Sequence, residues 1–283
     1  MKKILLVIQG ETYRDGYQGT RTRCTQRSIP LQEAATASHV QFIRALQQNF
    51  GYECDVVLNL YSANEELDNK IINLYSQYKI FSNFNKILLG ESNLLNQSLQ
   101  LINNNIINIY DSILFIRPDL YLKRYFSEIF NPQENKILFA HVNEICYNWH
   151  LVSDKTRPAV NHQITYIPKR FFQHLFFNKI LFLHDSYLMS LNNGIKEEDI
   201  WFFIDTYHSS STDITWNPIF HQVGREENKV WLDKGYRVDK TTRKPIFIDN
   251  DNIYENLINN DFNNNIKFHN NKISFNKLLN AWE

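Results

Sequence analysis

The first half of the chain alternates short aliphatic runs with longer segments in which apolar residues recur at helical spacing. Residues 4–8 form a continuous aliphatic run that ends near Gly10, as in a buried central strand of a parallel sheet. Residues 33–50 follow with helical spacing, and Gly51 stands where a helix C-cap is expected. Since repeated strand–helix units build parallel sheets with right-handed crossovers, this alternation predicts an α/β fold.

The alternation continues to residue 116 and then becomes less regular. Further strands are expected at residues 55–61, 86–89, 110–116, 136–142 and 164–167. Further helices are expected at residues 64–78, 94–103, 169–183 and 197–206. The chain has 283 residues and no Pro-rich or Ser-rich linker, so we expect a single domain. It consists of two halves, residues 1–125 and 126–248, and an Asn-rich C-terminal segment, residues 249–283.

Charge and cysteine content exclude several classes of protein. Lys and Arg total 30 and Asp and Glu total 30, so the chain has no net field that attracts nucleic acid. No basic face interleaved with aromatic residues is evident either, and we expect no nucleic-acid partner. The three cysteines, Cys24, Cys54 and Cys146, match neither a disulfide framework nor a zinc spacing. This pattern predicts a reducing compartment and hence a cytoplasmic location.

No apolar stretch approaches the length of about 20 residues that spans a bilayer, so we expect no integral membrane segment. The apolar start of the chain stops at Gln9 without a small-residue cleavage site, which favours a first strand over a signal peptide. Residues 171–182 are densely apolar and carry Lys169, Arg170 and Lys179 beside them. Core packing is the commoner explanation of such a run, and weak association with a membrane surface is the alternative.

The common Gly-rich nucleotide motifs and the zinc-protease and serine-hydrolase motifs do not occur in the sequence. The polar loop at residues 9–30 is long and holds three glycines and four arginines. Such a loop can place cations and backbone amides around a diphosphate, and the alternative is a solvated mobile loop. The candidate nucleotide-binding residues of this part are Gln9, Gly10, Thr12, Arg14 and Arg21, together with Asn59 in the second expected strand.

The most informative segment is residues 110–122, an apolar strand that runs into Arg117-Pro118-Asp119. Pro118 interrupts the ladder, so Asp119 is expected to leave the sheet at its carboxyl edge, where open α/β sheets bind ligands. A carboxylate there can hold a divalent cation against a diphosphate, and a guanidinium can bind phosphate oxygens in bidentate fashion. The alternative is a local ion pair between Arg117 and Asp119 that closes a turn.

This segment resembles small GT-A-like glycosyltransferases of bacterial surface polysaccharides and large DNA viruses, in which a strand ends in Arg-x-Asp. In these enzymes the segment takes the place of an Asp-x-Asp motif that binds metal and nucleotide-sugar. The resemblance implies a GT-A-like, Rossmann-like fold with a mostly parallel sheet flanked by helices. It also implies a nucleotide-sugar donor bound by residues 1–125, with UDP-sugar as the first choice, and a glycan acceptor bound by residues 126–248. Asp119 is then a candidate metal ligand for manganese or magnesium, although Arg117 replaces one carboxylate of the motif.

A second segment, residues 197–211, resembles the acceptor side of the same enzymes. Its acidic start after Gly194 suits a helix N-terminus, whose dipole keeps a carboxylate ionised, as the base of an inverting transferase requires. The alternative is that these acids only complement the helix dipole. The candidate catalytic residues are Glu197, Glu198, Asp199 and Asp185. His208 is a candidate metal or diphosphate ligand, and Arg225 is a candidate cation for the nucleotide, although a lone histidine is more often structural.

Two other functions fit the same pattern. A metal-dependent nucleotidyl- or phosphotransferase would use the sheet-edge carboxylate with magnesium and needs a second acid near Asp119. A non-catalytic carbohydrate-binding module would stack sugar rings on aromatic side chains and would need no donor nucleotide. The aromatic residues available for stacking in the second half include Tyr147, Trp149, Tyr166, Tyr187, Trp201, Tyr207, Trp216 and Trp231.

Overall fold

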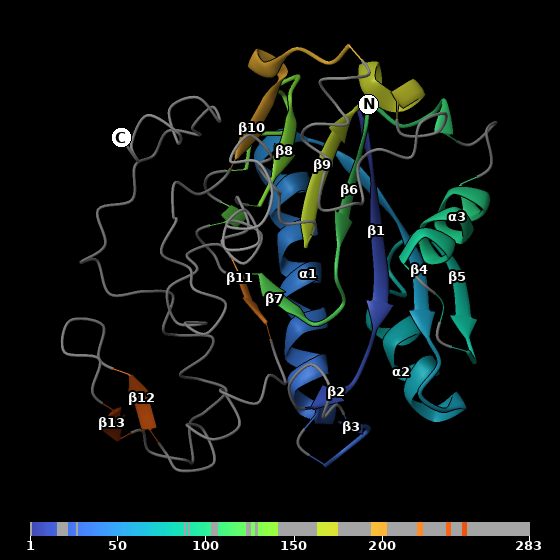
Figure 1. Ribbon diagram of the computed structural model, residues 1–283, viewed down its shortest axis with the longest axis vertical. Coiled ribbons are helices and arrows are strands. Elements are labelled where there is room, and N and C mark those ends of the chain that lie inside the picture. The colour runs from blue at the N-terminus through green and yellow to red at the C-terminus, as the bar shows by residue number, and fades with distance from the viewer. Residues whose placement is uncertain are drawn as a thin grey trace, which may run out of the picture.

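A seven-stranded sheet forms the centre of the computed structural model (Figure 1). The structure describes residues 2–15, 22–26, 28–87, 89, 91–102, 107–122, 126–127, 130–140, 163–174, 194–202, 220–222, 236–238 and 245–247. Across the sheet the strands follow the order β10-β8-β9-β6-β1-β4-β5. Their bounds are β1 (Lys3–Glu11), β4 (Glu53–Tyr61), β5 (Ile80–Asn85), β6 (Ser112–Ile116), β8 (Ile137–Phe139), β9 (Ile164–Pro168) and β10 (Ile200–Phe202).

The sheet is mostly parallel, as predicted. β1 pairs in parallel with both β4 and β6, β4 pairs in parallel with β5, and β10 pairs in parallel with β8. β9 runs antiparallel to its neighbours β6 and β8, so it is the reversed strand of the seven. The chain moves from β1 outward through β4 to β5 and then returns to place β6 on the other side of β1, so the strand order reverses between β1 and β6.

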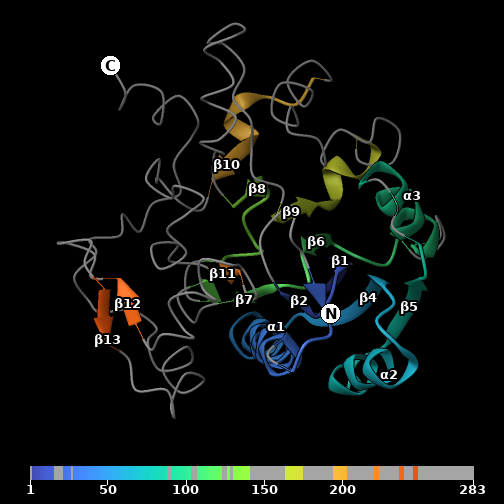
Figure 2. The same cartoon turned by 60° about the horizontal axis from the view of Figure 1, so that its bottom comes forward.

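Helices cover both faces of the sheet, which explains why β1 is apolar throughout its centre. α1 (Ser28–Phe50) and α2 (Glu65–Leu74) lie on one face, and α3 (Glu91–Leu101) lies on the other (Figures 1 and 2). Ile4, Leu6 and Ile8 belong to the core on the side of α1 and α2. Leu5 and Val7 belong to the core on the side of α3. Alternate residues of one strand therefore build two separate cores, and the predicted α/β class is confirmed.

Two pairs of short strands lie at the carboxyl edge of the sheet, the lower end in Figure 1, and a third pair lies apart from it. β2 (Arg14–Asp15) and β3 (Thr22–Arg23) form a small antiparallel pair directly after β1. β7 (Leu120–Leu122) follows β6 and pairs with β11 (Phe220–Gln222), so a distant segment of the chain returns to the strand after Asp119. β12 (Tyr236–Val238) and β13 (Pro245–Phe247) form a further antiparallel pair.

Two of the expected elements were wrong. The third strand occupies Ile80–Asn85 instead of residues 86–89, because a polar edge strand pairs with β4 there, whereas Ile87 has 74% of its surface exposed. Over residues 197–202, the described part of the helix expected at residues 197–206, the chain forms the short 3-10 helix η3 (Glu197–Asp199) and then β10; residues 203–206 lie outside the described part. Residues 200–202 pair with β8, and a sheet partner overrides helical apolar spacing. The helix expected from residue 169 begins as the 3-10 helix η1 (Lys169–Phe171).

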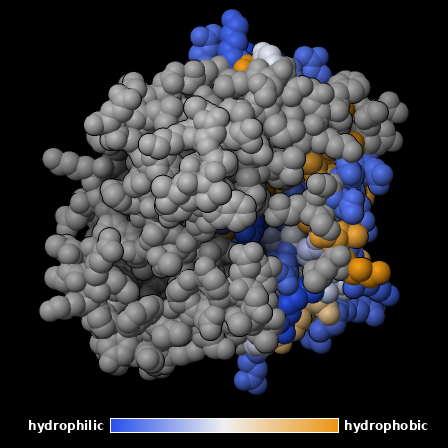
Figure 3. Space-filling model, viewed as in Figure 1, coloured by the Kyte–Doolittle hydropathy of each residue, from blue (hydrophilic) through white to orange (hydrophobic). Residues whose placement is uncertain are grey.

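The described surface visible in Figure 3 is largely hydrophilic, with apolar patches on the side of β5. Leu74, Ile87 and Ile109 are the large apolar residues exposed in the described part of the chain. Phe171 and Phe172, from the densely apolar run, are buried in the core on the side of α3. Within the residues that the structure describes, no helix has the length and apolarity needed to cross a membrane. The division into two halves and the cytoplasmic location stay predictions.

Candidate functional site

The site lies where the strand order reverses, at the carboxyl ends of β1 and β6. In open α/β sheets this edge is the usual place for a ligand, because the loops that leave neighbouring strands diverge there. β1 ends at Glu11 and β6 ends at Ile116, and Arg117-Pro118-Asp119 follows β6 directly. The predicted exit of Asp119 at the carboxyl edge is therefore confirmed.

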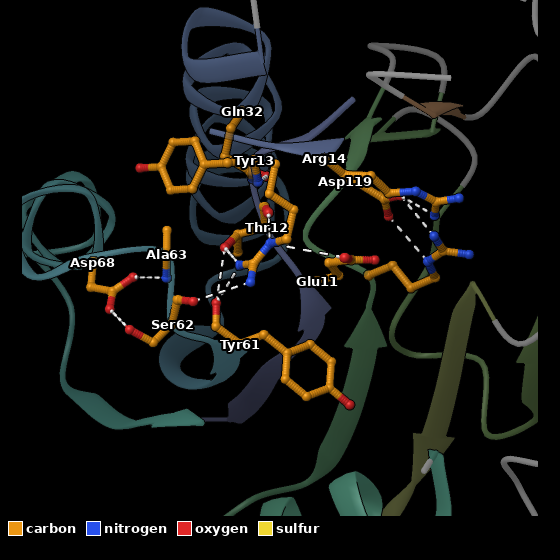
Figure 4. Close-up of polar contacts among 12 residues, drawn as sticks. Glu11, Thr12, Tyr13, Arg14, Gln32, Tyr61, Ser62, Ala63, Asp68 and Asp119 are labelled. Carbon is orange, nitrogen blue, oxygen red and sulfur yellow. Dashed lines mark hydrogen bonds and ion pairs between the residues drawn. The ribbon is translucent and has the colours of Figure 1, made fainter. Parts of the chain in front are cut away.

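Asp119 is held by two arginines from different parts of the chain (Figure 4). Arg117 donates from Nε to Asp119 Oδ1 at 3.0 Å and from Nη2 to Oδ2 at 2.7 Å, a bidentate arrangement. Arg14 donates from Nη1 to Oδ2 at 3.3 Å. The side chains of Asp119 and Arg14 are 1% and 4% exposed, whereas that of Arg117 is 27% exposed. The local ion pair considered for Arg117 and Asp119 is thus present, and it extends to a buried second cation.

Close backbone packing brings the two segments of this cluster together. Gly10 has φ +132°, and a Cβ atom built on it would lie 3.2 Å from Cδ of Pro118. Tyr13, between the strand and Arg14, has φ 52°, which is unusual for a residue with a side chain. A glycine at position 10 therefore allows the end of β1 to lie directly against the turn that carries Asp119.

Arg23 links the end of β1 to the end of β4 through hydrogen bonds to backbone carbonyl groups. Its guanidinium donates to the carbonyl oxygens of Thr12 at 3.1 Å, Tyr61 at 2.8 Å and Ser62 at 3.1 Å. Arg23 lies opposite Arg14 in the β2–β3 pair, so one hairpin contributes two cations to the same edge of the sheet. Arg14, Arg23 and Arg117 therefore lie close to the acids Glu11 and Asp119 at this edge of the sheet.

Buried polar side chains of α1 hold the turn after β6 and the strand β7 that follows it. Gln32 donates from Nε2 to the carbonyl oxygen of Pro118 at 2.8 Å, and Ser38 Oγ accepts from the backbone N–H of Leu122 at 2.8 Å. His39 contacts the carbonyl oxygen of Leu120 through Nε2 at 2.7 Å and the hydroxyl of Tyr75 through Nδ1 at 2.8 Å. Since a carbonyl only accepts, Nε2 carries the proton and Nδ1 accepts from Tyr75.

His39 is fully buried, and burial lowers its pKa from the usual 6.5 to about 4. The imidazole is therefore neutral at physiological pH, in agreement with the tautomer that its two contacts require. A neutral, fully hydrogen-bonded histidine in this position acts as a rigid link between α1 and β7, and it has no spare nitrogen for a metal.

A second polar cluster lies beside the site, at the carboxyl ends of β1, β4 and β5. Asn59 is completely buried and donates to the carbonyl oxygen of Leu94 at 2.8 Å and to Ser98 Oγ at 2.9 Å. Its own oxygen accepts from Nδ2 of Asn85 at 3.0 Å, and Ser98 donates to Gln9 Oε1 at 2.8 Å. These contacts hold α3 against the carboxyl ends of the strands, so Asn59 has a structural role beside the site.

The candidate nucleotide-binding residues in the described part of the chain gather at this one edge: Gln9, Gly10, Thr12, Arg14, Asn59, Arg117 and Asp119. Thr12 is fully buried and hydrogen-bonds the carbonyl oxygen of Tyr61 at 3.2 Å, which makes it part of the strand-end framework. Four other candidates, Arg21, Asp185, His208 and Arg225, lie outside the described residues.

The structure does not bring the acids of the η3 segment to this edge. The strand pairing places Trp201 of β10 at the same height in the sheet as Leu114 of β6, through Leu138 of β8 and Tyr166 of β9. Asp199, two residues before Trp201, is therefore at the height of Ser112, the first residue of β6. Arg117 comes five residues later, roughly 16 Å along the strand direction at about 3.3 Å per residue. Asp199 instead pairs with Arg170 at 2.6 Å, and Glu198 lies 3.7 Å from Lys196. Glu197 begins the same turn at the amino edge.

The described residues do not fit a divalent cation at Asp119. Both carboxylate oxygens of Asp119 accept hydrogen bonds from arginines, and these cations repel a metal ion. In the described ranges, no group of three or more His, Cys, Asp or Glu side chains is arranged to hold an ion. The chemistry at this edge is therefore derived below from the arginines.

The sequence interpretation missed Gln32, His39 and the structural role of Arg23. A signal for the first two was present, because Gln32, Thr36 and His39 recur at helical spacing among apolar residues and so share the buried face of α1. Polar side chains on a buried face need partners, and here those partners are backbone groups of the site. The carbonyl contacts of Arg23 depend on the β2–β3 hairpin, which the sequence pattern did not predict.

No known family model matches the chain, and no curated protein matches its sequence. Several solved structures of glycosyltransferases are similar in structure. The chain resembles the bifunctional glycosyltransferase WbbM with a TM-score of 0.39 and 10% identity, over 71% of this chain and 38% of WbbM. It resembles mouse xyloside xylosyltransferase 1 with a TM-score of 0.37 and 13% identity, over 72% of this chain and 85% of that one. It resembles a mutant of Drosophila β1,4-galactosyltransferase 7, bound to manganese, UDP-Gal and xylobiose, with a TM-score of 0.38 and 10% identity, over 79% of this chain and 71% of that one. Likeness at this level assigns neither family nor activity, so the function is argued from the residues of the site.

Proposed function

We propose that the protein is a glycosyltransferase that moves a sugar from a nucleotide-diphosphate donor to a hydroxyl group of a glycan or other acceptor, with UDP-sugar as the first donor to test. The observation that carries the proposal is the cluster of Arg14, Arg23 and Arg117 at the carboxyl edge, where the strand order reverses. This edge suits a nucleotide, and the arginines suit its diphosphate.

Arg117 is the residue best placed to contact the diphosphate. Its Nε and Nη2 atoms are fixed by Asp119, so the plane of the guanidinium is set before a ligand arrives. A guanidinium has five N–H donors, and the bonds to Asp119 use only one side of the group. With 27% of its side chain exposed, Arg117 can present its remaining donors to phosphate oxygens without leaving Asp119.

The preorganised arginines serve the chemistry through electrostatics. When the bond between the sugar and the diphosphate breaks, negative charge grows on the leaving phosphate oxygens. A cation that is already oriented beside these oxygens, as proposed for Arg117, stabilises the transition state more than the ground state, because it needs no reorganisation. Asp119 has the role of orienting Arg117 and Arg14. The proposal assigns no base to Glu198 or Asp199, which lie at the opposite edge of the sheet.

A donor-hydrolysis and transfer assay tests the proposal. The purified protein is incubated with UDP-, GDP-, dTDP- and CDP-sugars, with and without glycan acceptors, and release of the nucleoside diphosphate is measured. We expect release from one nucleotide class and a loss of at least tenfold in Arg117→Gln, which keeps the buried pair of Arg14 and Asp119. Turnover of nucleoside triphosphates with magnesium would instead support a phosphotransferase. Glycan binding without any effect of nucleotides would support a carbohydrate-binding module.

A further inference from the structure

Three buried polar residues of α1 contact the segment from the turn after β6 to β7, and Gln32 differs from the other two in one respect. Ser38 and His39 contact only β7, at Leu122 and Leu120. Gln32 reaches the carbonyl oxygen of Pro118, which directly precedes Asp119. It also accepts, through Oε1, a hydrogen bond of 3.0 Å from the backbone N–H of Tyr13, which directly precedes Arg14.

A single carboxamide thus bridges the two segments that carry the buried ion pair. Arg14 and Asp119 are 105 residues apart in sequence, and their side chains meet at 3.3 Å. Gln32 is 2% exposed, so neither of its bridging hydrogen bonds is exchanged readily for water. A primary amide both donates and accepts, and this position uses one function for each segment. The positive φ of Tyr13 adds to the need for a fixed partner at its N–H.

We propose that Gln32 is a positioning residue for the diphosphate site, which holds Arg14 and Asp119, and through Asp119 also Arg117, in the arrangement that binds phosphate. This inference rests on the proposed function for its effect on a ligand, but its structural part does not depend on that function. A role limited to stability would lower the melting temperature and leave the binding of nucleotide unchanged. A positioning role lowers affinity as well, because misplaced cations lose charge-assisted hydrogen bonds to the ligand.

The matched variants are Gln32→Met and Ser38→Ala. Both remove buried polar groups of α1 that hold the turn after β6, but only Gln32→Met also releases Tyr13. Binding of the free nucleoside diphosphates UDP, GDP, dTDP and CDP is measured by calorimetry for both variants, and melting temperatures are recorded. We expect both variants to melt earlier, but only Gln32→Met to lose affinity, by about tenfold. Equal affinity for Gln32→Met and wild type would overturn the proposal. If Gln32→Met does not fold, Gln32→Glu takes its place: it keeps the acceptor for Tyr13 but loses the donor to Pro118, so the bridge is broken at the side of Asp119, and unchanged nucleotide affinity in this variant would likewise overturn the proposal.

A double-variant cycle without ligand separates this inference from the proposed function. Gln32→Met, Asp119→Asn and the combined variant are compared in chemical unfolding. If Gln32 positions Asp119, the combined variant loses less stability than the sum of the two single variants, because the first change has already displaced the carboxylate. Strictly additive losses would overturn the positioning role. If wild type binds none of the nucleoside diphosphates while the cycle shows coupling, the proposed function fails and the positioning of Asp119 by Gln32 stands.

Discussion

Replacing Asp119 by Asn should destabilise the protein more than replacing Arg117. The substitution keeps the shape of the side chain but removes the carboxylate charge that both Arg117 and Arg14 contact, and the side chain of Arg14 is only 4% exposed. Breaking a buried ion pair by removing one partner lowers the free energy of unfolding by about 3–5 kcal/mol. At roughly 2–4 °C per kcal/mol for a chain of this size class, the melting temperature should fall by roughly 6–20 °C.

Arg117→Gln is the control for this prediction. Arg117 is 27% exposed, and its removal leaves Asp119 paired with Arg14 at 3.3 Å. The loss should be near that of charge-assisted hydrogen bonds at a partly solvated site, about 2 kcal/mol or less. Urea unfolding followed by circular dichroism measures both changes. An Asp119→Asn variant that unfolds within about 1 kcal/mol of wild type would refute the reasoning, because the substitution weakens three charge-assisted hydrogen bonds, one of them to a buried arginine.

A double replacement, Arg14→Met with Asp119→Leu, separates stability from function. Apolar side chains of similar volume often replace a buried ion pair without loss of stability, since the desolvation of two charges is avoided. We therefore expect the double variant to be more stable than Asp119→Asn. Nucleotide binding should nevertheless be lost, because Arg117 no longer has the carboxylate that orients it. Retention of nucleotide affinity in this variant would show that Asp119 has no part in the site.

Three further predictions concern acid, backbone and metal. The free energy of unfolding should fall by about 3 kcal/mol as the pH drops from about 6.5 to 4. In this range His39 takes up a proton in the unfolded chain, whereas in the folded protein its pKa is about 4. A His39→Gln variant should lack this decrease when unfolding is measured across the same pH range. Gly10→Ala should lower the free energy of unfolding by about 1–3 kcal/mol, which is more than the loss from Gly51→Ala. Both glycines have positive φ, but only the new Cβ at position 10 meets Pro118. Equal losses in urea unfolding would contradict this. EDTA should leave the affinity for the nucleoside diphosphate unchanged in calorimetry, because arginines occupy both oxygens of Asp119; a requirement for manganese would place metal ligands elsewhere in the chain.

The α/β class and the place of the site were predictable because they depend on local patterns. Two patterns, each within about ten residues, indicated strands that end at a loop. One is the aliphatic run of β1 with Gly10, and the other is the strand β6 that stops before Pro118. Both patterns point to the carboxyl edge of a parallel sheet, and the structure confirms this for Gly10 and Asp119.

The contacts within the site were less predictable because they join distant segments. Nothing near Arg14 in the sequence indicates that it meets Asp119, or that Gln32 bridges the two loops. The acids around Asp199 were misplaced for a similar reason. Helical spacing suggested a helix there, but pairing of β10 with β8 decides the local structure, and the level of that pairing puts the acids at the amino edge.

Binding of free nucleoside diphosphates to wild type and Arg117→Gln tests the central claim most directly. Thermal shift and calorimetry are carried out with UDP, GDP, dTDP and CDP, because a ligand that binds only the native state raises its melting temperature. We expect that one of them raises the melting temperature of wild type and binds Arg117→Gln at least tenfold more weakly, which is a loss of about 1.4 kcal/mol or more of binding free energy. A wild type that none of the four stabilises at millimolar concentration would contradict the claim that this edge of the sheet is a nucleotide site.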